Sequence, residues 1–198
     1  MPPTVPEIDW PIRTQRLTLR LATPEDLRAV FKIRSRPEVG QWMPDLPTSY
    51  DAWVLAQGQR GGVERMVVVL LDDHDPEPDP TVIGHLYLHV EDAWSQSEVR
   101  DQATRTQAEV GWAFDPAHQG HGFATEAVRE LLRVCFEDLG VRRVVALAFA
   151  DNAPSLRVME KVGMRREALM VRESLHRELG WVDGVSYALL AEEWLSSR

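Results

Sequence analysis

The segment with the strongest chemical signature is Gln119-Gly120-His121-Gly122-Phe123-Ala124-Thr125, which joins an expected strand to an expected helix. The first backbone N–H groups of a helix have no partner within that helix, and the helix dipole adds positive charge there. Gly120 and Gly122 let the main chain curl and let a bulky anion approach without a β-carbon in the way. The turn therefore suits a phosphate or diphosphate. The alternative is a plain turn with no ligand, and the segment matches neither G-x-x-x-x-G-K-[ST] nor G-x-G-x-x-G.

A strand and a helix are expected to hold this turn in place. Residues 107–114 (QAEVGWAF) have the pattern of a strand that leads into it. From Phe123 onward, apolar residues recur at helical spacing, and Gly140 is placed to end the helix. The members of this apolar face are Ala124, Ala127, Val128, Leu131, Leu132, Cys135 and Leu139.

The remaining elements alternate between strands and helices along the chain, without a repeat or an evident linker. We expect an α+β fold: one domain, residues 1–198 with its core at about 16–194, in which a central mixed sheet carries helices on its faces. Residues 142–150 (RRVVALAFA) have the composition of a strand covered on both faces. The other expected strands are 16–22, 65–71, 81–90, 167–175 and 184–194; the other expected helices are 24–34, 49–61 and 153–162; residues 35–47, 72–80 and 91–106 are expected to be loops.

Composition narrows the range of partners. The net charge of −9 argues against nucleic acid, and it tolerates or attracts a cationic substrate such as an amine. The single cysteine, Cys135, cannot form a disulfide within the chain and is expected to be a buried apolar residue, which fits the cytoplasm. No signal peptide and no apolar run of membrane-spanning length is evident, so no membrane association is expected. Whether the chain forms a homodimer stays open.

The segment Gln119–Ala124 resembles the Q/R-x-x-G-x-G/A motif of the GNAT N-acetyltransferase superfamily. The stretches ATEAVRELL and NAPSLRVMEKVGM, together with RLTLRLATPEDLRAVFKIRSRPEV at 16–39, resemble its branch of ribosomal-protein N-terminal (alanine or serine) acetyltransferases. The resemblance extends over about 16–194. It implies the acyl-CoA N-acyltransferase fold, a mostly antiparallel mixed sheet flanked by helices.

The resemblance also implies acetyl-CoA as the acetyl donor. Backbone N–H groups of the Gln119–Thr125 turn would hold the diphosphate, and the main chain of Phe114 would pair with the pantetheine arm. The N–H of Trp112 would point at the thioester carbonyl, where negative charge develops. Asn152 is expected to cap the next helix and to touch the cofactor arm. No metal is expected: His85 and His89 lack an evident third ligand.

The resemblance also implies two side chains that could transfer protons, Glu109 and Ser155. Glu109, three residues before Trp112, resembles the glutamate of similar strands and is the candidate base; the equal alternative is a solvated or ion-paired carboxylate. Histone-type members place their carboxylate at the position of Ala108, so a β-bulge would be needed to restore the geometry. Many members use a tyrosine as the acid where this chain has Met159. Ser155 resembles the serine that the ribosomal-protein branch offers instead, and its alternative role is to satisfy the helix backbone.

The expected function is the transfer of an acetyl group to a primary amine, either a protein N-terminus or a small molecule, through a tetrahedral intermediate. Trp42, His176 and Trp181 fall in loops expected to border the acceptor. One alternative is another acyl donor, such as succinyl-CoA. The other is a non-catalytic acyl-CoA binding or sensing domain, in which the fold is kept and the chemistry is lost.

Overall fold

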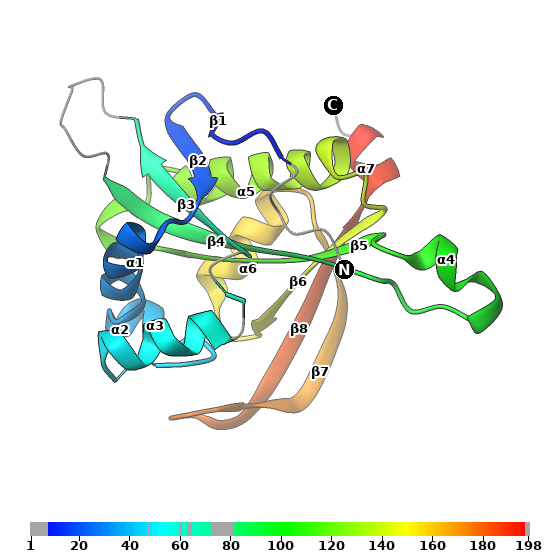
Figure 1. Ribbon diagram of the computed structural model, residues 1–198. Helices are drawn as coiled ribbons and strands as arrows, with labels where there is room; N and C mark the ends of the chain where they lie inside the picture. Colours follow the sequence, from blue (N-terminus) through cyan, green and yellow to red (C-terminus); the bar gives the residue numbers. More distant parts are fainter. Residues whose placement is uncertain (1–7, 47, 60, 63–64, 73–80, 197–198) are drawn as a thin grey trace. The chain divides into compact units, whose positions relative to one another are not determined.

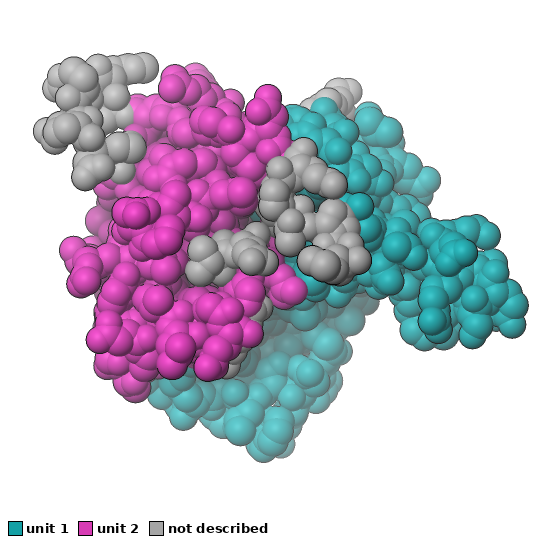
Figure 2. Space-filling model, in the orientation of Figure 1, with its two compact units in different colours: residues 1–3, 89–111, 131–198 teal, residues 4–88, 112–130 magenta. Residues whose placement is uncertain are grey.

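The computed structural model describes residues 8–46, 48–59, 61–62, 65–72 and 81–196. The chain folds into two compact units, each assembled from separate stretches of sequence (Figure 2). Unit 1 contains residues 1–3, 89–111 and 131–198, and unit 2 contains residues 4–88 and 112–130. The expected one-domain organisation stays a prediction. The acidic turn expected at 72–80 lies, beyond its first residue, outside the described residues.

The strands follow the order β1-β2-β3-β4-β5-β6-β8-β7 in an eight-stranded mixed sheet (Figure 1). All the described strand pairs are antiparallel except β5 with β6, which is parallel. The predicted α+β class with a mostly antiparallel sheet is therefore confirmed. Within the part of the chain that is described, no helix is both long and apolar enough to cross a membrane.

Unit 2 opens with an antiparallel meander whose strands carry alternating or continuous apolar residues. Strand β1 (Ile12–Arg13) pairs with β2 (Leu17–Leu21), which pairs with β3 (Met66–Leu71), which in turn pairs with β4 (Val82–Glu91). Leu17 and Leu19 of β2 have no exposed surface, as the alternation of this strand predicts. Strand β1 is too short to leave a periodic signal, and it was not predicted.

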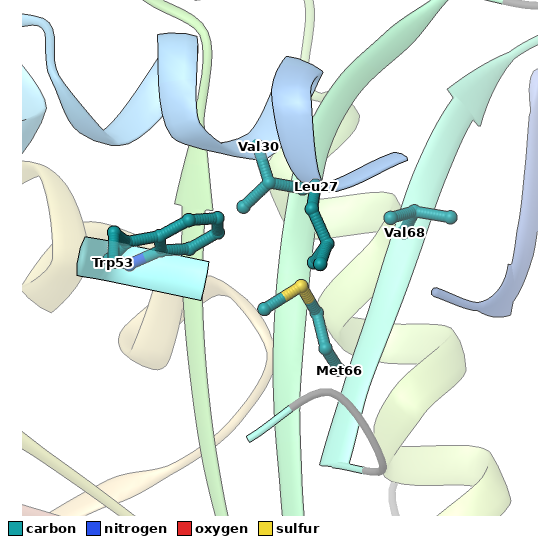
Figure 3. Close-up of a cluster of buried hydrophobic side chains, with 5 residues drawn as sticks. All are labelled: Leu27, Val30, Trp53, Met66 and Val68. Atoms are coloured by element: carbon teal, nitrogen blue, oxygen red, sulfur yellow. The ribbon is translucent and has the colours of Figure 1, made fainter. Parts of the chain in front are cut away.

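The helices that follow β2 pack a core on this unit. They are the 3-10 helix η2 (Pro24–Asp26), α1 (Leu27–Arg34), α2 (Pro37–Gly40) and α3 (Tyr50–Gln59). Leu27 and Val30 of α1 and Trp53 of α3 cluster with Met66 and Val68 of β3 (Figure 3). Helix α2 lies where a loop was expected, because Pro37 is suited to the first position of a helical turn.

The elements around the turn match the prediction closely. Strand β5 (Gln107–Phe114) has the predicted bounds, and a 3-10 helix η5 (Pro116–His118) follows it. Helix α5 (Phe123–Arg133) continues as a π-helical segment η6 (Val134–Asp138), after which Gly140 adopts a φ of +66°. The helix predicted from Phe123 to Leu139 is thus present with a change of winding near its end.

Unit 1 contains the second half of the sheet. Strand β6 (Arg143–Phe149) pairs in parallel with β5 and antiparallel with β8 (Gly180–Leu190), which pairs with β7 (Arg165–His176). Helix α6 (Ala153–Lys161) joins β6 to β7, and α7 (Ala191–Ser196) ends the described chain. The 3-10 helix η4 (Ser97–Val99) and α4 (Arg100–Ala103) lie in the excursion before β5.

Three expectations for unit 1 need correction. Strand β6 is covered on both faces only in its first half, since Leu147 is 58% exposed. Strand β7 is longer than predicted, β8 begins and ends earlier in the chain than predicted, and the two form a hairpin in which His176 pairs with Gly180. Residues 191–194, predicted as strand, begin helix α7, because the acidic residues Glu192 and Glu193 suit the first turn of a helix.

Candidate active site

The predicted anion turn has the backbone geometry that its glycines suggest. Gly120 and Gly122 adopt φ values of +82° and +81°, a region that residues with a β-carbon rarely enter. A β-carbon at Gly120 would meet no atom within 4 Å, so the surrounding space is open. The first helical hydrogen bond runs from the N–H of Glu126 to the carbonyl of Gly122. The N–H groups of Phe123, Ala124 and Thr125 therefore precede the helical ladder of α5, and the residues present fit a diphosphate.

The turn is braced by the segment between β1 and β2, which lies beside α5 (Figure 1). Arg16 donates from Nη1 to the carbonyl of His121 (2.9 Å) and from Nε to Oε2 of Glu126 (2.8 Å). Its backbone N–H and the hydroxyl of Thr14 both donate to Oε1 of Glu126, at 3.0 and 2.6 Å. The guanidinium also lies 4.7 Å from the ring centroid of Phe123. One residue thus contacts three positions of the turn and first helical turn.

Glu126 is held as a carboxylate. Burial opposes its ionisation, but hydrogen bonds from Thr14 and from Arg16 outweigh burial and lower the pKa of Glu126 below its usual value. It forms an ion pair with Arg16, in which Oε2 of Glu126 lies 2.6 Å from Nη2 of Arg16.

The start of the turn is fixed by Asp115. Its backbone N–H donates to the carbonyl of Ile83 (2.8 Å), and its carboxylate accepts from the N–H of Ala117 and pairs with Arg36. Beside it, the Phe114 ring occupies space above Gly84, where a β-carbon would lie 2.5 Å from Cδ1 of Phe114. Gly84 is therefore required for Phe114 to sit at the end of β5.

Strand β5 places Glu109 half-buried, opposite Val145 in the last described parallel pair with β6. Ala108 and Val110 are buried, and so is Ala113 further along. The buried positions thus change from even to odd numbers between Val110 and Ala113, the change of phase that a β-bulge produces. Ala108, the position of the histone-type carboxylate, has no exposed surface. Trp112 and Phe114 lie beyond the phase change and are partly buried.

Helix α6 begins as predicted. The buried side chain of Asn152 caps it by accepting a hydrogen bond from the N–H of Ser155 (3.3 Å). Ser155 is partly buried in the first turn. Met159 is buried at 1% exposure. Asn152, Ser155 and Glu109 belong to unit 1, whereas Trp112, Phe114 and residues 119–125 belong to unit 2.

The three residues expected in loops that border the acceptor differ in burial and in secondary structure. Trp42 is partly buried in the turn after α2, and Trp181 is 61% exposed on β8. His176 is buried at the end of β7, where its Nδ1 accepts from the N–H groups of Glu178 and Leu179 (both 3.2 Å). Its ring meets that of Phe149 edge-on. The prediction that His176 and Trp181 lie in a loop was wrong, because both belong to strands. His176 stabilises the β7–β8 turn by accepting these two hydrogen bonds.

The other candidate reactive groups are buried or half-buried. Burial raises the pKa of the Cys135 thiol to about 12, with a smaller contribution from Asp138, as suits the predicted buried apolar role. His85 is buried and His89 half-buried on β4. Among the residues described, no group of three or more histidine, cysteine or acidic side chains could hold a metal ion.

Three contributors to the turn were missed from the sequence: Arg16, Asp115 and Gly84. Arg16 meets Glu126 across a separation of 110 residues, which no local pattern records. Asp115-Pro116 did carry a signal, because an aspartate before a proline is a common helix cap.

The mixed sheet, with a glycine turn between β5 and α5, matches the fold of a solved GNAT-family acetyltransferase from Bacillus anthracis, with a TM-score of 0.75 and 28% identity over 93% of this chain and all of that chain. The chain matches the Acetyltransferase (GNAT) domain family over residues 16–165, and it belongs to that family. It is 30% identical over 184 residues to the uncharacterized N-acetyltransferase YnaD of Bacillus subtilis, covering 92% of this chain and 98% of YnaD. It is 27% identical over 192 residues to the putative ribosomal N-acetyltransferase YdaF of the same organism, covering 91% and 94% of the two chains.

Among solved structures, Mycobacterium smegmatis RimJ in complex with CoA-disulfide is similar, with a TM-score of 0.69 and 25% identity over 89% of this chain and 83% of that chain. The predicted resemblance to the ribosomal-protein branch of the GNAT superfamily is thus confirmed. The protein is an acetyl-CoA-dependent N-acetyltransferase.

Proposed function

We propose that the enzyme moves the acetyl group of acetyl-CoA directly to a primary amine through a tetrahedral intermediate. The observation that carries this proposal is the turn between β5 and α5, where two glycines at positive φ lie at the start of a helix and open space lies over Gly120. Such a start binds a diphosphate through backbone N–H groups and the helix dipole. Membership of the GNAT family supports the choice of donor.

The donor would be held mainly by main-chain groups. Residues 119–125, namely Gln119, Gly120, His121, Gly122, Phe123, Ala124 and Thr125, would surround the diphosphate. The main chain of Phe114 would pair with the pantetheine arm as an added strand does. Asn152, besides capping α6, would touch the same arm.

The chemistry needs a neutral amine and a stabilised oxyanion. Glu109 would take a proton from the ammonium form of the acceptor, directly or through water. The amine nitrogen then attacks the thioester carbon, and the backbone N–H of Trp112 donates to the oxygen on which negative charge develops. Collapse breaks the C–S bond, and the proton that the attacking nitrogen loses would pass through the Ser155 hydroxyl to the leaving thiolate, which departs as a thiol. The burial pattern of β5 supports Glu109 over position 108, because Ala108 is fully buried and Glu109 is not.

The acceptor is a primary amine of either a protein N-terminus or a small molecule. The name of the relative YdaF, a putative ribosomal N-acetyltransferase, favours peptide N-termini as the first acceptors to test. The net charge of −9 favours a cationic acceptor of either kind.

Calorimetry with CoA, followed by assays of thiol release, tests the proposal. The acceptors are peptides beginning with alanine or serine, free amino acids and polyamines, and succinyl-CoA replaces acetyl-CoA in a parallel series. We expect binding of CoA and release of thiol with at least one amine. Failure to bind CoA at millimolar concentration would exclude the turn as a diphosphate site. Binding without thiol release for any amine or donor would instead indicate a sensing domain.

A further inference from the structure

Arg16 lies outside the predicted site and contacts both the turn, at His121 and Phe123, and the first helical turn, at Glu126. Through Nη1 it holds the carbonyl of His121, which lies between the two glycines, and through Nε and Nη2 it holds the carboxylate of Glu126. Its guanidinium also lies over the ring of Phe123, and the His121 ring stacks on the same ring with centroids 5.5 Å apart. The Arg16 side chain thus ties both the turn and the start of α5 to the segment before β2.

Glu126 creates an electrostatic problem for an anion site. A carboxylate in the first turn of a helix is stabilised by the helix dipole, but it also repels a second anion bound at the same helix start. Arg16 and the hydroxyl of Thr14 occupy both oxygens of this carboxylate. Because the Arg16 charge offsets that of Glu126, the first turn of α5 meets a diphosphate with no net charge from this pair.

The contact with His121 adds a geometric restraint. The main chain at Gly120 and Gly122 adopts a conformation open mainly to glycine, and glycine has the greatest freedom to leave it. A charge-assisted hydrogen bond to the carbonyl between them fixes the peptide plane, and therefore the direction of the neighbouring N–H groups.

We propose that Arg16 is a positioning residue for the diphosphate of the donor: it neutralises Glu126 and orients the 119–125 turn. This inference rests on the proposed function, because it needs the turn to bind a diphosphate. Arg16 acts through Glu126 and His121, and it takes no part in the acetyl transfer.

The test compares acetyl-CoA with acetyl-pantetheine, a donor that lacks the diphosphate and nucleotide. For Arg16→Gln we expect the KM for acetyl-CoA to rise about tenfold, because the diphosphate then meets an unshielded Glu126 carboxylate beside a less restrained turn, with kcat within about twofold. The KM for acetyl-pantetheine should stay unchanged. Arg16→Lys keeps the charge but cannot hold both partners. Its KM for acetyl-CoA should therefore lie between that of the unaltered enzyme and that of Arg16→Gln.

The double variant Arg16→Gln/Glu126→Gln separates neutralisation from direct contact with the donor. It removes the unshielded carboxylate, so we expect it to recover most of the loss in KM seen for Arg16→Gln. If Arg16 itself bound the phosphates, Arg16→Gln would raise the KM for acetyl-CoA by the same factor with or without Glu126→Gln, and that result would overturn the proposal.

Arg20→Gln is the matched control. Arg20 forms an ion pair with Asp26 (2.6 Å) from the neighbouring strand β2, away from the turn. It should lower the melting temperature without raising the KM for acetyl-CoA. An equal rise in KM for both donors in Arg16→Gln, or no rise, contradicts the inference. Equal KM values of the unaltered enzyme for both donors would instead contradict the diphosphate site itself.

Discussion

Nη1 of Arg34, the last residue of α1, lies 3.4 Å from Nε2 of His85 on β4. Since a guanidinium can only donate, Nε2 must accept, which assigns the ring proton to Nδ1. Arg34 also pairs with Asp45, and its guanidinium carbon lies 5.9 Å from the ring centroid of Trp53. Among the described residues, Nδ1 of His85, Nε of Arg34 and Nε1 of Trp53 have no hydrogen-bond partner. A positive charge on His85 would be especially costly in this setting.

This arrangement predicts acid sensitivity. Burial, with a smaller contribution from Arg34, lowers the pKa of His85 to about 3. The unfolded chain protonates this histidine below about pH 6.5 while the folded chain does not, so stability falls as the pH drops from 6.5 toward 3. The loss should reach about 2 to 3 kcal/mol at pH 4.5.

The variant His85→Gln tests this dependence, because glutamine keeps an acceptor for Arg34 and does not titrate. Urea unfolding between pH 8 and 4.5 should show a shallower loss of stability in His85→Gln than in the unaltered chain. Equal slopes for the two chains would show that His85 does not contribute to acid unfolding.

Local patterns predicted the elements that bury a periodic face. The strand at 107–114 and the helix from Phe123 were placed accurately because alternation and the i, i+3, i+4 spacing are dictated by burial on one side. The short elements β1 and α2 were not predicted, since two or four residues are too few to show a periodic pattern and their conformation depends on tertiary contacts. The end of β6 also differed, because apolar Leu147 is exposed where the sequence suggested burial.

In the candidate site, too, the features set by local sequence were predictable, and those set by tertiary contacts were not. The turn was predictable because glycine spacing and a helix start are encoded within seven residues, and the Asn152 cap likewise is local. The ion pair of Arg16 with Glu126 was not predictable from the sequence, since it depends on how the β1–β2 segment packs against α5. The role of Gly84 likewise depends on the Phe114 ring of another strand.

A pair of glycine substitutions separates backbone strain from donor binding. Gly120→Ala and Gly140→Ala both place a β-carbon at positive φ in open space, so each should lower stability by about 1 kcal/mol. Only Gly120 belongs to the turn, so only Gly120→Ala should raise the KM for acetyl-CoA. Thermal melts and steady-state kinetics on both variants check this. A similar KM increase in Gly140→Ala would mean that general destabilisation is responsible.

Ser155 can be tested apart from its helix. The cap of α6 uses the backbone N–H of Ser155, which donates to Asn152, so Ser155→Ala removes the hydroxyl and keeps the cap. As a proton donor to the leaving thiolate, its loss should lower kcat by about tenfold or more with little change in melting temperature. Asn152→Ala, in contrast, should lower stability by about 1 kcal/mol through loss of the cap. Unchanged kcat in Ser155→Ala would leave the hydroxyl with a structural role alone.

Glu109→Gln is the sharpest test of the chemistry, because it keeps the size of the side chain and removes its basicity. If Glu109 deprotonates the acceptor, kcat should fall by about 100-fold or more, and the rise of rate with pH should be lost or shifted upward. The control is Glu91→Gln, a half-buried carboxylate of β4 that accepts from Nε2 of Gln107 (2.7 Å) and should keep full kcat. Adding Ala108→Glu to Glu109→Gln should not restore activity, because position 108 has no exposed surface. If turnover and its pH profile survive in Glu109→Gln, water or the acceptor's own equilibrium supplies the neutral amine, and Glu109 is an ordinary strand carboxylate.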